Sequence, residues 1–289
     1  MLHKLRLYAG FIKIEHTLFA LPFAYAGALL AAQGWFGWNL FFLILTAFTG
    51  LRTAAMTFNR IIDREIDARN PRTMYRHLPA GLISLKEAYA IAVISLALYF
   101  ISAFFINETA FLLSPIPAIT AYIYPYLKRY TCLSHFVLGL NLAYAPGGGW
   151  VSVTNSADIF GNEFVPFVLG IAVIFWVAGF DMIYALQDVE FDRKYGLHSL
   201  PAHFGEGFAV MASEISHVIF FILLLVSLNT YGLDSAFTAG LAVIATLLII
   251  EHYIVRTGVD EKSIQISFFY LNAAISATLL LSIAVGALL

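Results

Sequence analysis

Two stretches of the sequence repeat acidic side chains at intervals of four residues. The first contains Asn59, Asp63 and Asp67, and the second contains Asp188 and Asp192. Residues four apart lie on one face of a helix with their Cβ atoms about 6 Å apart, so ionised carboxylates at this spacing repel one another. For either pair alone, a solvated helix end is the simple explanation. If the two clusters face each other, they need divalent cations, and oxygen ligands without histidines at matching spacing favour Mg²⁺.

Arginines crowd around the first acidic cluster. They are Arg60, Arg64, Arg69, Arg72 and Arg76. Guanidinium groups bind phosphate through two parallel hydrogen bonds, and protein-bound Mg²⁺ commonly bridges carboxylates to substrate phosphates. Carboxylates, magnesium and arginines together predict a pocket for an organic diphosphate.

The elements that must position these residues are predicted to cross a membrane. Of the 289 residues, 61% are hydrophobic and only 12% are charged, against about 25% charged in soluble proteins. Apolar runs of roughly 17–25 residues, long enough to cross a bilayer, recur along the chain. The nine expected helices are 14–32, 39–62, 87–106, 109–127, 132–152, 164–187, 207–229, 235–255 and 264–288. We therefore expect an all-α, multi-pass protein of the cell membrane, surrounded by lipid, with neither a nucleic acid nor an obligate protein as partner.

Basic residues predict which helix ends face the cytoplasm. All Lys and Arg residues except Arg52 precede the first expected helix or lie in and around the even-numbered connections. The positive-inside rule makes the N-terminus and these connections cytoplasmic, so both acidic clusters lie at cytoplasmic helix ends and the pocket opens to the cytoplasm. Four expected helices separate the clusters. This suggests one domain, 1–289, built of two parallel repeated halves with acidic motifs at 59–67 and 181–192.

Two further charged residues fall within expected helices. Arg52 lies about two turns before Asn59, and Asp181 lies seven residues before Asp188. Charged side chains inside a membrane face a protein interior or a wet cavity. Arg52 is therefore either a ligand contact or one half of a structural ion pair. Tyr184 extends the four-residue step of the second cluster backwards.

The first cluster carries a family resemblance. The sequence resembles the UbiA superfamily of intramembrane prenyltransferases, whose first motif, Asn-x-x-x-Asp-x-x-x-Asp, is present as Asn59, Asp63 and Asp67. The stretch "NPRTMYRHLPAG" at 70–81 is similar to the loop that follows this motif in the family.

The second cluster extends the resemblance over nearly the whole chain. The family's Asp-x-x-x-Asp motif is present as Asp188 and Asp192, and "RKYGLHSLPAHFG" at 193–205 is similar to its Gly-x-x-Ser-x-Pro loop. A Tyr-x-x-x-Lys element of the family matches Tyr124 and Lys128.

The resemblance implies a fold and a reaction. The fold is a ring of nine helices around a central cavity that opens laterally to lipid. The reaction is Mg²⁺-dependent transfer of a prenyl group from a prenyl diphosphate to an acceptor, which we expect to be a 4-hydroxybenzoate-like or naphthoate-like ring in lipid quinone biosynthesis. A glycerophosphate acceptor in ether lipid synthesis is the alternative within the family.

Two alternative hypotheses give the protein a function other than prenyl transfer. An ion-coupled transporter would also explain the repeated halves and the intramembrane charges. Transporter sites lie near the bilayer midplane, however, and these carboxylates crowd at the cytoplasmic ends, which favours the enzyme. A scaffold with inactive motifs is disfavoured because both acidic pairs are intact.

The resemblance also implies roles for individual residues. Two Mg²⁺ ions would be held by Asp63, Asp67, Asp188 and Asp192, making the diphosphate a better leaving group. The residues expected to contact substrate are Asn59, Arg72, Arg76, Tyr124, Lys128, Tyr184 and Arg52. Ionisation leaves an allylic carbocation that must be kept from water. Asp181 is expected to stabilise this cation or to help remove a ring proton, unless it pairs with Arg52.

Overall fold

The computed structural model describes residues 2–13, 15, 17–158, 164–231, 235–258 and 260–288. In these ranges the chain forms helices joined by turns and loops, without a β-strand, which confirms the all-α prediction. The long helices are α2 (Thr17–Ala32), α3 (Trp38–Ile62), α5 (Leu85–Ile106), α7 (Pro115–Leu127), α8 (Ser134–Thr154), α9 (Phe164–Ala185), α12 (Glu206–Tyr231), α13 (Ser235–Thr257) and α15 (Asn272–Leu288). The shorter helices are α1 (Leu2–Ile12), α4 (Arg64–Arg69), α6 (Glu108–Leu113), α10 (Val189–Tyr195), α11 (Leu200–Phe204) and α14 (Glu261–Gln265). A 3₁₀ turn, Leu186–Asp188, joins α9 to α10, and a π-helical turn, Ile266–Leu271, joins α14 to α15.

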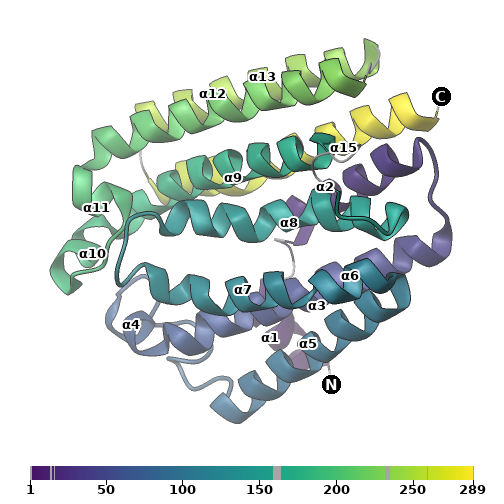
Figure 1. Cartoon of the computed structure of the whole chain (residues 1–289). Helices are drawn as coiled ribbons and strands as arrows, with labels where there is room; N and C mark the ends of the chain where they lie inside the picture. Colours follow the sequence, from purple (N-terminus) through teal and green to yellow (C-terminus); the bar gives the residue numbers. More distant parts are fainter. Residues whose placement is uncertain are drawn as a thin grey trace.

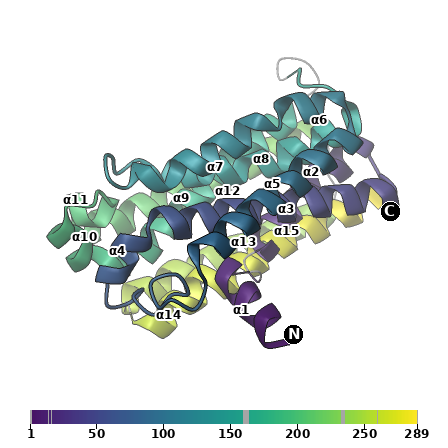
Figure 2. The same ribbon diagram turned by 90° about the horizontal axis from the view of Figure 1, so that it is seen from below.

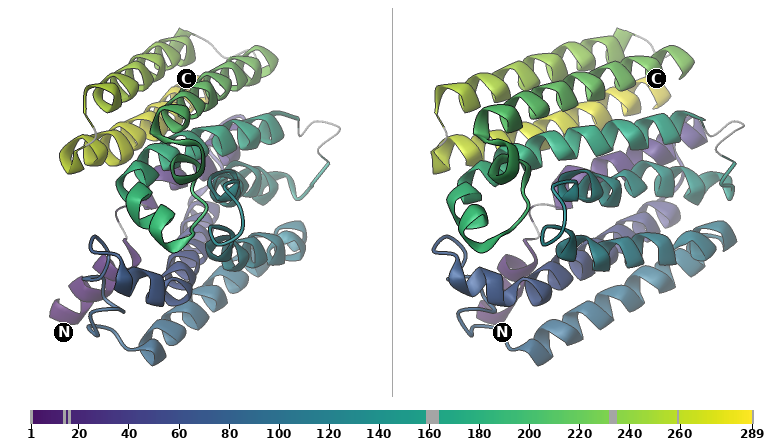
Figure 3. Two further views of the ribbon diagram at one scale, coloured as in Figure 1. Left: turned by 90° about the vertical axis from the view of Figure 1, so that its left-hand side faces the viewer. Right: turned by 60° about the vertical axis from the view of Figure 1, so that its left-hand side comes forward.

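The long helices lie side by side with roughly parallel axes, and α4, α10 and α11 gather at one end of the bundle (Figure 1). The packing contacts run in a closed order from α2 through α3, α7, α8, α9, α12, α13 and α15 back to α2 (Figures 2 and 3). Helix α5 packs on α3, and α2 also packs directly on α8. Because α4 and α10 carry the ends of the two acidic motifs, this arrangement brings both motifs to the same end of the bundle.

Seven segments of the described chain are long and apolar enough to cross a membrane. They are Trp38–Ile62, Leu85–Ile106, Glu108–Leu127, Phe164–Tyr195, Glu206–Ser227, Ser235–Thr257 and Lys262–Leu288, and Ala20–Ala32 is a shorter apolar helix. Each expected range overlaps helical chain, but 109–127 covers both α6 and α7, and 264–288 covers the end of α14, the π-helical turn and α15. Residues 14 and 16 of the first range lie outside the described residues. The count of nine membrane crossings and the cytoplasmic N-terminus stay predictions.

Helix α9 lies in the most buried of the seven apolar segments. In this segment, 67% of the residues in the apolar stretch are buried inside the protein. In the other six segments the buried share is 22–33%. A helix that is apolar around its whole circumference belongs in an interior, and Trp176 and Val177 are fully buried. Helix α5 instead exposes Val93 and Ile101, as expected of a surface that faces lipid.

Helices α2 and α8 approach so closely that they require glycine. A Cβ atom on Gly149 would lie 1.8 Å from the backbone oxygen of Ala24, and one on Gly27 would lie 2.1 Å from that of Pro146. Helix α8 runs through this stretch without a break. The "PGGGW" run at 146–150 therefore serves close helix packing.

Replacing Gly149 by alanine is expected to destabilise the protein, because overpacking of a tight contact typically costs about 1–3 kcal/mol. Gly148→Ala is the matched control on the same helix, since no atom lies within 4 Å of a Cβ built there. Thermal unfolding of both variants in detergent measures the difference. Equal unfolding temperatures for Gly149→Ala and Gly148→Ala would contradict the conclusion that Gly149 is required for the contact between α2 and α8.

Each acidic motif lies at a break between helical elements. Asp63 separates α3 from α4 with φ −91° and ψ 7°, and Asp188 separates the 3₁₀ turn from α10 with φ −110° and ψ 6°. Both ψ values are far from the helical value of about −42°. The expectation of one regular helical stripe is therefore wrong, although Asp67 N still donates to Asp63 O at 2.7 Å. The four-residue step is kept across a break.

Candidate active site

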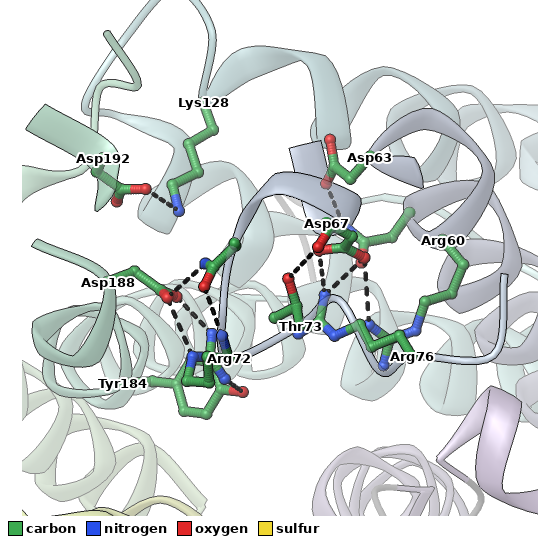
Figure 4. A network of polar contacts seen from close by, with 12 residues as sticks. Arg60, Asp63, Asp67, Arg72, Thr73, Arg76, Lys128, Tyr184, Asp188 and Asp192 are labelled. Carbon is green, nitrogen blue, oxygen red and sulfur yellow. Dashed lines mark hydrogen bonds and ion pairs between the residues drawn. The ribbon is translucent and has the colours of Figure 1, made fainter. Parts of the chain in front are cut away.

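Asp67 is buried against arginines of its own motif and of the following loop. Its carboxylate accepts hydrogen bonds from Arg76 Nη1 at 2.7 and 2.9 Å, and Arg60 Nη1 lies 4.0 Å away (Figure 4). The Thr73 hydroxyl donates to the backbone oxygen of Asp67 at 3.1 Å, which fixes the loop against α4. Only 5% of Asp67 is exposed, so protein cations rather than water must balance its charge.

Asp63 has weaker partners than Asp67. Asn59 Nδ2 donates to Asp63 Oδ2 at 3.0 Å, and Arg129 Nη2 lies 3.4 Å from Oδ1 while donating to Ile62 O at 2.7 Å. Burial, followed by the negative charge of Asp67, raises the pKa of Asp63 to about 6, and Arg129 opposes this rise. An additional cation beside this carboxylate would therefore favour its ionised form.

The two clusters meet at Asp188. Arg72, in the loop after α4, forms an ion pair with both carboxylate oxygens of Asp188, with Arg72 Nε 3.0 Å from Oδ1 (Figure 4). Asn70 Nδ2 donates to the same Oδ1 at 2.9 Å, and its own side-chain oxygen accepts the Arg72 backbone N–H at 2.9 Å. Arg72 Nη1 also donates to Tyr184 OH at 2.9 Å. The loop of the first motif thus reaches the second motif, and the expected facing of the two clusters is present.

Lys128 forms an ion pair with Asp192, the fourth carboxylate of the two motifs. Its Nζ lies 3.0 Å from Oδ1 of Asp192, which is fully buried. The backbone oxygen of Lys128 accepts the His198 N–H at 2.7 Å, which ties the loop after α10 to the end of α7. Tyr124 lies one turn before Lys128 on α7, so both side chains share a face.

Each of the four carboxylates therefore has its own basic partner. The pairs are Asp63 with Arg129, Asp67 with Arg76, Asp188 with Arg72 and Asp192 with Lys128. Among the described residues, no three Asp, Glu, His or Cys side chains converge closely enough to hold a metal ion by themselves. Mg²⁺, however, usually takes one or two protein carboxylates and completes its shell with water and phosphate oxygens. Two facing pairs of carboxylates, with no soft donor among them, fit such an ion.

Comparison with known proteins decides the family. The model of the UbiA prenyltransferase family matches residues 20–273. This chain belongs to that family. The protein of Saccharophagus degradans named 4-hydroxybenzoate octaprenyltransferase is 30% identical over 227 residues, which cover 78% of this chain and 74% of the relative. The protein of the same name from Marinobacter nauticus is 30% identical over 254 residues, which cover 86% of this chain and 84% of the relative.

Solved structures of UbiA homologues share the fold. The apo structure of a UbiA homologue from Aeropyrum pernix K1 matches with a TM-score of 0.85 at 38% identity, over 94% of this chain and 98% of that chain. A UbiA homologue from Archaeoglobus fulgidus bound to GPP and Mg²⁺ matches with a TM-score of 0.74 at 23% identity, over 96% of this chain and 99% of that chain. The second likeness shows the fold alone. The resemblance read from the acidic motifs is confirmed, and the chain is a membrane prenyltransferase of the UbiA family.

The two intramembrane charges of this UbiA family member do not pair with each other. Asp181 Oδ2 lies 2.7 Å from His135 Nδ1, and Arg52 Nη1 donates to the backbone oxygen of Ile12 at 2.9 Å. Ile12 is the last residue of α1, where carbonyl groups have no partner within the helix. The alternative of an Arg52–Asp181 ion pair is therefore wrong, because each side chain has a different partner.

Three residues of the site were missed in the sequence. Asn70 opens the loop that follows the first motif, Arg129 directly follows Lys128, and His135 is a single histidine at the start of an apolar run. The adjacent basic pair at 128–129 was a usable signal, since two neighbouring cations at the helix end that carries the acidic clusters can serve two carboxylates. Nothing in the sequence alone pairs His135 with Asp181.

A cavity of about 530 Å³ opens beside the first acidic cluster, between α3, α4, α5, α7 and α10. Its polar and aromatic lining includes Glu65, Arg69, Tyr126, Arg129 and Tyr195. Because Arg129 also contacts Asp63, this cavity reaches the edge of the acidic site. The central cavity and lateral opening implied by the resemblance stay predictions.

Proposed function

We propose that this prenyltransferase uses Mg²⁺ to transfer a prenyl group from a prenyl diphosphate to a ring carbon of a 4-hydroxybenzoate-like acceptor in lipid quinone biosynthesis. The observation that carries the proposal is the set of four carboxylates, each paired with an arginine or lysine, at one end of the bundle. The names of the relatives support the acceptor class. The homologue bound to GPP and Mg²⁺ supports the class of the prenyl donor.

The metal would be held by Asp63 and Asp67 on one side and by Asp188 and Asp192 on the other. When bound, Mg²⁺ neutralises the diphosphate as a Lewis acid and improves it as a leaving group. Asn59, which donates to Asp63 at 3.0 Å, orients that carboxylate.

Arg72, Arg76 and Lys128 are placed to exchange partners when substrate binds. Each now contacts a carboxylate, and arginine binds phosphate with the same paired geometry that it uses for carboxylate. A diphosphate between the clusters would take over these donors. Tyr184, bonded to Arg72, and Tyr124, one turn from Lys128, can add hydroxyl hydrogen bonds to the phosphate oxygens.

The reaction follows from this placement. The bond between C1 of the prenyl chain and the diphosphate oxygen breaks, its electron pair leaves with the diphosphate, and an allylic cation remains. A ring carbon of the acceptor supplies the electrons of the new C–C bond, after which the ring loses a proton to a base. Asp181 is the proposed base, and its negative charge also stabilises the cation. The cation must meet the ring before it meets water.

Arg52 is proposed to bind the carboxylate of the acceptor. It lies on α3, seven residues before Asn59, with one guanidinium nitrogen held by Ile12 O at 2.9 Å. A planar guanidinium recognises a carboxylate through paired hydrogen bonds. In this proposal the carboxylate of the acceptor lies about two turns deeper along α3 than the diphosphate.

An Arg52→Gln variant is expected to raise KM for 4-hydroxybenzoate by about 10–100-fold, because a charged hydrogen bond contributes about 1.5–3 kcal/mol. The KM for geranyl diphosphate should stay the same. Steady-state kinetics with 4-hydroxybenzamide provide the matched control, since this neutral acceptor lacks the carboxylate and should react similarly with both enzymes. An equal loss with both acceptors would instead assign Arg52 to the packing of α1 on α3.

The test of the whole proposal uses purified protein in detergent. Binding of geranyl diphosphate is titrated with and without Mg²⁺, and products are identified by mass spectrometry after 4-hydroxybenzoate, a hydroxynaphthoate and a glycerophosphate are added together. We expect Mg²⁺-dependent binding and a prenylated 4-hydroxybenzoate. A prenylated glycerophosphate would move the acceptor to the ether-lipid class, and failure to bind under any metal condition would overturn the proposal.

A further inference from the structure

His135 joins Asp181 to the loop that follows the second acidic motif. His135 Nδ1 lies 2.7 Å from Asp181 Oδ2, and the Leu200 backbone N–H donates to His135 Nε2 at 3.2 Å. The His135 side chain is 4% exposed. It therefore connects the start of α8, the last turn of α9 and the first residue of α11.

The partner at Nε2 decides where the imidazole carries its proton. A backbone N–H can only donate, so Nε2 of His135 must be the unprotonated, accepting nitrogen. The proton of the neutral ring is then on Nδ1, which donates to Asp181 Oδ2. The hydrogen bond at one ring nitrogen thus fixes the role of the other, as it does for histidines that orient a ligand group.

The loop side of this bridge has a local cause. Leu200 is the first residue of α11, and the first N–H groups of a helix lack partners within the helix. Ser199 precedes it, but the Ser199 side chain makes no capping hydrogen bond. The His135 imidazole takes the place of the cap. Its position on α8 is therefore coupled to the loop that contains the second motif's Gly-x-x-Ser-x-Pro sequence.

The carboxylate side of the bridge faces the reaction site. Asp181 lies three residues before Tyr184 on α9, and residues at this spacing share a face. Tyr184 OH is bonded to Arg72, which holds Asp188. On α9, which lies in the most buried of the seven apolar segments, the Asp181 side chain keeps 19% of its surface open.

We propose that His135 is a positioning residue, which holds one oxygen of Asp181 so that the carboxylate is aimed at the acceptor ring. This inference rests on the proposed function, in which the ring gives up a proton after the C–C bond forms. That proton passes from the ring carbon to Asp181, the electrons of the C–H bond return to the ring, and Asp181 becomes a carboxylic acid. His135 keeps its own proton throughout and sets only the direction of the carboxylate.

Two variants separate the two halves of the bridge. In His135→Asn the side-chain amide can replace the Nδ1 donor to Asp181, and in His135→Gln the longer side chain can replace the Nε2 acceptor for Leu200. We expect His135→Gln to lower kcat by about 10–100-fold, as when the hydrogen-bond partner that orients a metal ligand is removed. His135→Asn should keep most of the wild-type kcat. The KM for geranyl diphosphate should not change in either variant. The reverse order, with His135→Gln more active than His135→Asn, would assign His135 to loop anchoring and overturn the proposal.

A second measurement does not depend on catalysis. Full-length protein labelled with ¹⁵N-histidine is examined by NMR in detergent at neutral pH, and the His135 signals are assigned by their loss in His135→Gln. We expect a proton on Nδ1 and none on Nε2. A protonated Nε2 would overturn the proposal even if transfer proceeds. If wild-type enzyme forms no prenylated product, the proposed function fails, while the protonation pattern of His135 can still be read.

Discussion

Replacing Asp188 by asparagine is expected to lower kcat for prenyl transfer by roughly 10²–10³-fold, the effect of removing one electrostatic group from a preorganised site. Asp188 contributes one carboxylate to the facing pairs, and it holds Arg72 and Asn70 in place. Asparagine has the same size and still offers one acceptor, so the loop contact is largely kept. The negative charge that Mg²⁺ needs is lost. Activity is measured over a range of Mg²⁺ concentrations, and we expect higher Mg²⁺ to recover only part of the loss.

Glu214→Gln is the matched control for this charge change. Glu214 on α12 pairs with Arg256 on α13 at 2.6 and 2.7 Å, and this pair is solvent-exposed at the arginine. Exposed pairs contribute about 0–1 kcal/mol, so the control should fold and turn over as the wild type does. Full Mg²⁺-dependent activity in Asp188→Asn would remove this carboxylate from the mechanism.

The helices and the two motifs were predictable because each depends on local rules. The length of an apolar run is set by the thickness of a bilayer, and the helix ranges could therefore be read without knowledge of packing. The four-residue steps of Asp63, Asp67, Asp188 and Asp192 are likewise properties of a single segment. The facing of the two clusters was expected from their matching places in two parallel halves. The need for cations followed from that facing, since four carboxylates at one end of a bundle repel one another.

The pairing of particular side chains could not be predicted, because it depends on contacts between distant segments. Arg72 and Asp188 are 116 residues apart, and five arginines near the first motif were equal candidates in the sequence. The ψ value near zero at Asp63 depends on how α4 packs. The partner of Asp181 is decided by the position of α8 beside α9, which places His135 next to it where the sequence suggested Arg52.

Replacing Arg72 by glutamine is expected to raise KM for geranyl diphosphate and, without metal, to lower the thermal midpoint. The variant leaves Asp188 without its strongest partner, and removing one partner of a fully buried pair costs about 3–5 kcal/mol. The cost here should be smaller, because 30% of the Arg72 side chain is exposed. Mg²⁺ binding to the folded protein stabilises it by an amount that grows with the logarithm of its affinity. Since Arg72 no longer competes for Asp188, the Mg²⁺-induced rise in midpoint should be larger in the variant than in the wild type.

This combination separates two roles that a loss of activity alone would confuse. If Arg72 only neutralises Asp188 within the fold, Mg²⁺ should restore both the midpoint and the KM of Arg72→Gln. If Arg72 also passes from Asp188 to the diphosphate, Mg²⁺ should restore the midpoint while the KM stays high. Arg256→Gln, which removes an exposed guanidinium paired with Glu214, is the control and should show the wild-type response to Mg²⁺. An equal Mg²⁺ response in Arg72→Gln and wild type would mean that Arg72 and the metal do not share Asp188, and the exchange of partners would have to be abandoned.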